Sequence, residues 1–194
     1  MESSSSRMLL DFSITPFAEH RFMRFLLLFT LVAFGAVSLR GEDPPPRLEL
    51  KIAVPVHHHH RSLNTDGDHF HVLVKNVSDQ PIRLWTDRYA WGYDNLSFEE
   101  IAADGTATLI KKKARDWAKN VPDWLELKPG DTYVLNVNFS ARDIWENPPQ
   151  AKPGAKPTKF KLRAVYQTNP DRESVTHGVW TGKIESAVDT YSIW

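Results

Sequence analysis

The chain of 194 residues contains no cysteine. This absence excludes disulfide bridges, thiol redox catalysis and lipid attachment at a cysteine. The folded protein must therefore be held together by the burial of apolar side chains and by strand pairing. The chain is long enough to bury one substantial core, so one domain is expected.

The sequence also lacks an excess of either charge, because 24 lysines and arginines balance 24 aspartates and glutamates. A protein that binds a polyanion needs a sustained positive excess. The one basic cluster, at residues 111–119, is offset by Asp116 and by the nearby Asp123. We therefore expect no nucleic-acid partner, and a solvated strand edge explains the cluster.

Catalytic motifs are missing as well. The sequence has no Gly-x-Ser-x-Gly nucleophile elbow, no His-Glu-x-x-His metal motif and no glycine-rich phosphate loop. The adjacent carboxylates Glu99 and Glu100 would point to opposite faces of a strand, so they cannot act as a pair. The sequence therefore predicts a protein that is not an enzyme and has no cofactor.

One long apolar run is present, at residues 25–37. Arg21 and Arg24 precede this run and the small residues at 36–38 close it, which is the pattern of a secretory signal peptide. The run is shorter than the ~20 residues that a membrane-spanning helix needs. We expect a signal peptide helix over residues 1–38, cleavage at its end, and export to the periplasm, the cell surface or the medium.

Two alternatives stay open for this leader. Met23 offers a second start, which would give a compact leader without the acidic residues that come before it. An uncleaved signal anchor would keep the protein at the membrane, and this is the only membrane contact that the sequence indicates. Residues 39–46 are expected to form a proline-rich spacer, and residues 47–194 the folded domain.

Apolar residues alternate with polar residues along four segments of this domain, which is the period of a strand with one buried face. The inward positions are Leu48, Leu50, Ile52, Val54 and Val56; Phe70, Val72 and Val74; Tyr133, Leu135, Val137 and Phe139; and Phe160, Leu162, Ala164 and Tyr166. Shorter strands are expected at residues 82–85, 96–101, 106–112 and 179–194, the last with a register change near 186–189.

Helix is scarce in this pattern, with single turns expected near residues 114–120 and 140–145. Antiparallel strands with one buried face and polar turns between them must stack in two layers to cover their apolar sides. The sequence therefore predicts an all-β fold, a two-layer antiparallel β-sandwich of about seven strands.

Two C-terminal segments resemble the last two strands of exported bacterial immunoglobulin-like domains: KFKLRAVY at residues 159–166 and VWTGKIES at 179–186. The turn KPGD at 128–131 and the segment HVLVKNVSDQPIRLW at 71–85 are similar to the same kind of module, including proteinase-inhibitor domains of the BsuPI type. The resemblance implies an immunoglobulin-like β-sandwich over most of residues 47–194. It implies no activity, because such sandwiches carry unrelated functions.

Six histidines are concentrated in one region: His57, His58, His59, His60, His69 and His71. Because Phe70 and Val72 claim the inner face of their strand, the imidazoles of His69 and His71 should point to solvent. Neutral imidazoles are good ligands for Zn²⁺ and Cu²⁺, so the six histidines are a candidate metal site. A histidine-rich loop with only adventitious affinity for Zn or Cu is the plainer interpretation.

All seven tryptophans lie in the expected domain. Three of them stand in stretches with the composition of loops: Trp91, Trp117 and Trp124. Exposed indoles offer flat apolar platforms, and sugar-binding sandwiches use them in this way. These three residues are the candidate ligand platform of a carbohydrate-binding module. Packing at the ends of the core is the alternative for each of them.

These observations favour an exported, non-enzymatic β-sandwich module that binds a protein or a glycan at the cell envelope. Two other interpretations stay open, a periplasmic metal-binding protein that uses the histidines and a carbohydrate-binding module that uses the tryptophans. A hydrolase is the least favoured alternative.

Overall fold

Strands dominate the computed structural model, which describes residues 47–57, 60–64, 69–141, 143–151 and 156–193. The described residues form thirteen strand segments and two short helices. The expected signal peptide and spacer lie outside the described residues, and so do His58 and His59. Residues 45–194 form one compact unit.

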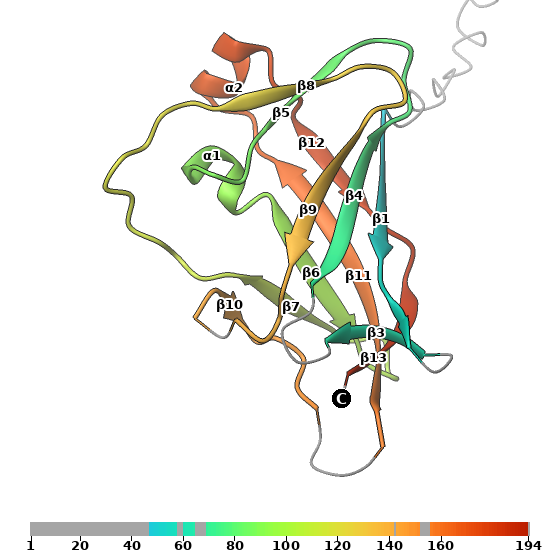
Figure 1. Ribbon diagram of the computed structural model, residues 1–194. Coiled ribbons are helices and arrows are strands. Elements are labelled where there is room, and N and C mark those ends of the chain that lie inside the picture. Colours follow the sequence, from blue (N-terminus) through green and yellow to red (C-terminus); the bar gives the residue numbers. More distant parts are fainter. Residues whose placement is uncertain (1–46, 58–59, 65–68, 142, 152–155, 194) are drawn as a thin grey trace, which may run out of the picture. The chain divides into compact units, whose positions relative to one another are not determined.

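Three antiparallel strands form one layer, in the order β1-β4-β9 (Figure 1). Their bounds are Leu48–Ala53 for β1, Phe70–Asn76 for β4 and Thr132–Val137 for β9. Successive side chains of a strand point to opposite faces. Phe70, Val72 and Val74 are fully buried, whereas His69 and His71 are exposed. The sequence prediction for both sets of side chains is therefore confirmed.

A second sheet packs against this layer, in the order β10-β7-β6-β11-β13-β3-β2, with β12 also paired to β11. Its strands are β2 (Val56–His57), β3 (His60–Asn64), β6 (Leu96–Ile101), β7 (Ala107–Lys112), β10 (Trp145–Glu146), β11 (Thr158–Thr168), β12 (Gly182–Glu185) and β13 (Asp189–Ile193). Its pairs are antiparallel apart from β13 with β3.

The strands β12 and β13 follow one another along the same side of β11. Glu185 of β12 stands opposite Val165, and Asp189 of β13 stands opposite Leu162, so the register slips by one residue between them. This is a bulge between β12 and β13. The register change predicted for the last strand is confirmed.

Aromatic side chains fill the space between the layers. Phe70 of β4 meets Phe98 of β6 edge-on, with 5.8 Å between the ring centroids. Phe139 lies 5.1 Å from Phe70, and Trp145 lies 5.6 Å from Phe98. Edge-to-face contacts of this kind favour well-defined ring positions in a core. The fold is thus an all-β sandwich, as the alternation of residues predicts.

Four further elements were only partly expected. A separate ladder pairs β5 (Ile82–Trp85) with β8 (Trp124–Leu127), and two helices are present, α1 (Ala90–Tyr93) and α2 (Arg172–His177). The prediction of a helical turn at residues 114–120 is wrong, because those residues form neither helix nor strand. The short strand β10 occupies the end of the second predicted turn. Neither helix is long and apolar enough to cross a membrane, in the part of the chain that the structure describes.

Candidate functional site

Aromatic rings of β5, β8 and the two helices contact one another: Trp85 meets Trp91 and His177, and Trp124 meets His177. Trp85 and Trp124 stand directly opposite one another in the β5–β8 ladder. Trp85 is 1% exposed, whereas Trp124, the first residue of its strand, is 39% exposed. Although the two residues are cross-strand partners, one indole is buried in the core and the other is partly exposed at the surface.

The helix α2 holds a histidine against the exposed indole. Its first turn is closed by a capping box, in which the Asp171 side chain accepts from the Ser174 backbone N–H and Ser174 bonds back to Asp171. Gly178 caps the C-terminal end of the helix, and its φ of 62° is in the left-handed region that favours glycine. His177, the last helical residue, lies 4.6 Å from Trp124 between ring centroids, at an interplanar angle of 31°.

Arg83, on β5, contacts both His177 and the Trp124 indole and so helps to hold them together. Its Nη1 donates to the His177 carbonyl oxygen at 3.1 Å, and its Nε donates to Glu126 Oε2 at 3.3 Å. The guanidinium carbon lies 6.0 Å from the Trp124 ring centroid, within the range of a cation–π contact. The position of the Trp124 indole is thus set by neighbours on two elements rather than by its own strand alone.

A pocket of about 420 Å³ opens beside this indole, and we name it the Trp124 pocket. Its apolar lining is Trp124, Leu125 and Val134, and its polar lining is Thr86, Asp87, Arg88, Asp123, Tyr133 and Asn136. Ligand pockets combine a mostly apolar wall with a few converging polar groups. The Trp124 pocket has the converging polar groups, and its apolar wall consists of the three side chains Trp124, Leu125 and Val134.

Hydrogen bonds hold the two carboxylates of the pocket in place. The Tyr133 hydroxyl donates to Asp87 Oδ1 at 3.0 Å, and the Thr86 hydroxyl donates to Asp123 Oδ2 at 2.6 Å. Burial raises the pKa of Tyr133, so its phenol stays a neutral donor at any physiological pH. A carboxylate has about four lone-pair sites, so both retain acceptor capacity for a ligand.

Two side chains of the pocket are open to a ligand from the solvent side. Arg88 is exposed and makes no ion pair or hydrogen bond with the described residues. Asn136, on the outer face of β9, has its Oδ1 2.9 Å from His71 Nδ1. Its amide NH₂ therefore keeps donors that face solvent.

The other two tryptophans of the predicted platform lie elsewhere. Trp91 is half-buried on α1, with its ring 6.0 Å from that of Trp85. Trp117 packs edge-on against Tyr93 at 5.3 Å, and the Arg115 guanidinium lies 4.8 Å from its ring centroid. Neither lines the Trp124 pocket. The prediction of a loop is wrong for Trp91, which is helical, and for Trp124, which begins β8.

A lysine lies close to this aromatic region. The Nζ of Lys112 sits 4.5 Å from the Tyr93 ring centroid. Burial lowers the pKa of this lysine, and the nearby carboxylates of Asp87 and Asp94 act in the opposite direction. Burial raises the pKa of Asp94, an effect that Lys112 partly offsets. The two groups therefore stabilise each other's charged forms.

The candidate metal site is brought together only in part. His57 and His60 are partners in the β2–β3 ladder, while His58 and His59 fall outside the described residues. Within the described ranges, no group of three or more histidines and carboxylates has a metal-binding arrangement. The six-histidine site therefore stays a prediction.

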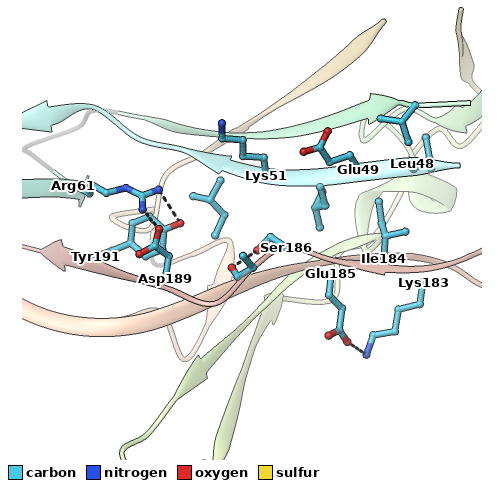
Figure 2. Close-up of a pocket in the computed structure, with 14 residues that line it drawn as sticks. Leu48, Glu49, Lys51, Arg61, Lys183, Ile184, Glu185, Ser186, Asp189 and Tyr191 are labelled. Atoms are coloured by element: carbon cyan, nitrogen blue, oxygen red, sulfur yellow. Dashed lines mark hydrogen bonds and ion pairs between the residues drawn. The ribbon is translucent and has the colours of Figure 1, made fainter. Parts of the chain in front are cut away.

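A second, larger concavity of about 800 Å³ runs between β1 and the strands β12 and β13, and we name it the β1 groove (Figure 2). At one end Arg61 forms an ion pair with Asp189 and lies over the Tyr191 ring, 4.7 Å from its centroid. Towards the other end Lys183 Nζ lies 2.5 Å from Glu185 Oε1. The charges on this wall are thus paired within the chain.

Sequence reasoning missed α2, and with it His177 and the support of the indole. The signals that could have revealed it are the cap residues at either end, Asp171 and Gly178.

Comparison of the sequence with protein-family models finds no match, and comparison with curated proteins finds no similar one.

Proposed function

We propose that this protein is an exported, non-enzymatic β-sandwich module that binds a carbohydrate in the Trp124 pocket. The observation that carries the proposal is a 39% exposed indole, fixed by α2 and Arg83, at the wall of a pocket with six polar side chains. Export is supported by the apolar run at residues 25–37 with its basic lead. The likeness to exported immunoglobulin-like domains is in keeping with this location.

A sugar ring matches the two kinds of surface that the pocket offers. The C–H groups on one face of the ring are weakly positive, and they stack on the negative face of an indole. The hydroxyls at its edge both donate and accept, so they can bond to the carboxylates of Asp87 and Asp123 and to the donors of Asn136 and Arg88. A volume of about 420 Å³ is at the low end for ligand pockets, which suits one or two sugar units.

Calorimetric titration with cello-, chito-, xylo- and malto-oligosaccharides tests the proposal on the protein as it accumulates in the producing cell. We expect at least one of these sugars to bind. Trp124→Ala should weaken that binding about tenfold or more, because an indole at the centre of a pocket carries much of the binding energy. Asn136→Ala, at an exposed strand position with less risk to the fold, should weaken binding by a smaller factor.

The matched control is Trp117→Ala, which removes a partly exposed tryptophan outside the pocket. We expect binding by this variant to stay within about twofold of the wild type. No binding of any of these sugars would contradict the proposal. Equal binding by wild type and Trp124→Ala would contradict it as well, and so would a larger loss in Trp117→Ala than in Trp124→Ala.

A further inference from the structure

Along one edge of β1, the main-chain N–H and C=O groups form no hydrogen bonds with another described strand. β1 is the first strand of its sheet and pairs only with β4. The Val77 N–H donates to the Arg47 carbonyl oxygen at 3.0 Å, which marks Arg47 as facing β4. In an antiparallel pair, residues whose N–H and C=O groups bond to the neighbouring strand alternate with residues whose groups point away from it. Leu48, Leu50 and Ile52 therefore turn their N–H and C=O groups outward.

The side chains of β1 also differ from one face to the other. Those of Leu48, Leu50 and Ile52 are buried in the core. Glu49 and Lys51 are exposed, and neither forms an ion pair or hydrogen bond with the described residues. Figure 2 shows both of them projecting from the side of β1 that faces away from Ile184 and Ser186. The edge thus carries one unpaired acid and one unpaired base on the same face.

Neither a bulge nor a proline interrupts β1 along this edge. Proteins usually blunt an edge with a bulge, a proline or an inward charge. The opposite wall of the β1 groove has such a bulge, between Glu185 and Asp189, and its charges are paired. β1 pairs with β4 in one unbroken register from Leu48 to Ala53. Pro55 comes only after its end.

We propose that β1 pairs with the β1 of a second copy of this chain, antiparallel and about a twofold axis at Leu50. Leu50 then faces the partner's Leu50, and Leu48 faces the partner's Ile52. In this register the outward N–H and C=O groups of one copy lie opposite the outward C=O and N–H groups of the other. Each facing pair exchanges two hydrogen bonds, which gives about six in total. The two layers β1-β4-β9 join into one continuous sheet, and the interface is the same patch on both subunits.

Charge complementarity selects this partner and this register. With the axis at Leu50, Glu49 stands directly opposite the partner's Lys51, and Lys51 opposite the partner's Glu49. These are the pairs whose side chains approach most closely across an antiparallel ladder. Moving the axis by one residue to Glu49 would oppose two glutamates and turn the wrong main-chain groups to each other. The β1 groove and the Trp124 pocket share no lining residue, so the two proposals are independent.

Sedimentation velocity tests the inference on the protein as it accumulates in the cell, with its N-terminus identified by mass spectrometry. The wild type is expected to be a dimer. Lys51→Glu should weaken dimerisation about tenfold or more, because it places like charges opposite each other twice. Glu49→Lys should do the same, although it also places a lysine opposite Lys75 of β4, so Lys51→Glu is the cleaner variant.

The double variant Glu49→Lys with Lys51→Glu restores opposite charges, and it should return the dimer to within about threefold of the wild type. The control is Lys161→Glu, the same charge change on β11, which is paired on both sides with β6 and β13. It should leave the dimer unchanged. A wild type that stays monomeric at about 100 μM, enough to populate even a weak dimer, would overturn the inference. A double variant as weak as the single ones would also overturn it.

Discussion

Asn76 shows how much a single buried side chain can organise at the end of a sheet. Its side chain is fully buried. The Nδ2 group donates to the carbonyl oxygens of Gln80 and Leu127, and Oδ1 accepts from the Ser78 N–H and hydroxyl. Leu127 ends β8 and Asn76 ends β4, so this amide connects the β5–β8 ladder to the layer β1-β4-β9. Every polar atom of the side chain has a partner, which is what burial requires.

Asn76→Ala should therefore destabilise the protein by about 2–4 kcal/mol, because it removes a buried donor from the Gln80 and Leu127 carbonyl oxygens and the acceptor of the Ser78 N–H. Urea unfolding at neutral pH measures the effect. Asn138→Ala is the matched control, since Asn138 also accepts from a serine two residues on, at 2.9 Å, but is only half-buried. A loss of about 1 kcal/mol or less is expected there. Equal losses in the two variants would contradict this account of Asn76.

The buried Tyr166 and the half-buried Tyr133 determine how the stability of the fold depends on alkaline pH. Burial raises the pKa of Tyr166 to about 12, and it raises the pKa of Tyr133 further. An unfolded tyrosine has a pKa of about 10, so the folded state favours the neutral phenol. The stability contributed by this preference is complete below pH ~10 and is lost as the pH rises towards the folded pKa.

We expect the free energy of unfolding to fall steeply above pH ~10, as followed by urea titrations at increasing pH. The Tyr166 hydroxyl, next to Asn95 and Thr168, makes no well-aligned hydrogen bond with the described residues. Tyr166→Phe should therefore be nearly neutral at pH ~7 and should reduce the alkaline loss. Stability that is flat up to pH ~12 in the wild type would show that these phenols are not held neutral.

At the scale of elements, α2 links the stability of a short helix to the Trp124 pocket. The helix has six residues, too few to be stable without its caps and its packing. Asp171→Ala removes the acceptor of a 2.6 Å hydrogen bond from the Ser174 N–H. The loss of such a cap costs about 1 kcal/mol. Because His177 ends this helix, the same change should loosen the contact between the His177 and Trp124 rings.

Fluorescence-detected urea unfolding checks both effects, through the unfolding free energy and through the emission of the native state. Thr176→Ala serves as the control, because Thr176 is exposed on the same helix and bonds only to the Arg172 carbonyl. Its effect should stay within about 0.5 kcal/mol. If Asp171→Ala proved no more destabilising than Thr176→Ala, the cap would not support the helix.

The elements also show which parts of the fold a sequence can predict. The strand β4 is predictable because the alternation of Phe70, Val72 and Val74 encodes a buried face directly. The helix α2 has no such pattern, since Val175 is 78% exposed, and only its cap residues mark it. Strand β8 has four residues and is defined by its partner β5, which lies far away in the sequence. The Trp124 pocket depends on that long-range pairing, so the residues alone suggested the tryptophan but not its neighbours.

At the scale of the whole molecule, binding at the cell envelope requires that the chain be exported and its leader removed. Mass spectrometry of the protein that accumulates in the producing cell measures this. We expect removal of residues 1–38, so that the mature chain begins at Leu39. Substitution of Ala36 by the bulky Phe should block cleavage, because signal peptidases need small residues at the exit. Recovery of an intact leader in the wild type would contradict export by a cleaved signal peptide.

The most direct measurement of the central claim is nuclear magnetic resonance of the indole N–H groups, assigned through single tryptophan-to-phenylalanine variants. The best-binding oligosaccharide from the calorimetric titrations is added stepwise. Our account predicts that the Trp124 signal shifts with saturation while those of the buried Trp85 and of Trp117 change little. Saturable shifts centred on Trp117, with the Trp124 signal unmoved, would contradict carbohydrate binding in the Trp124 pocket.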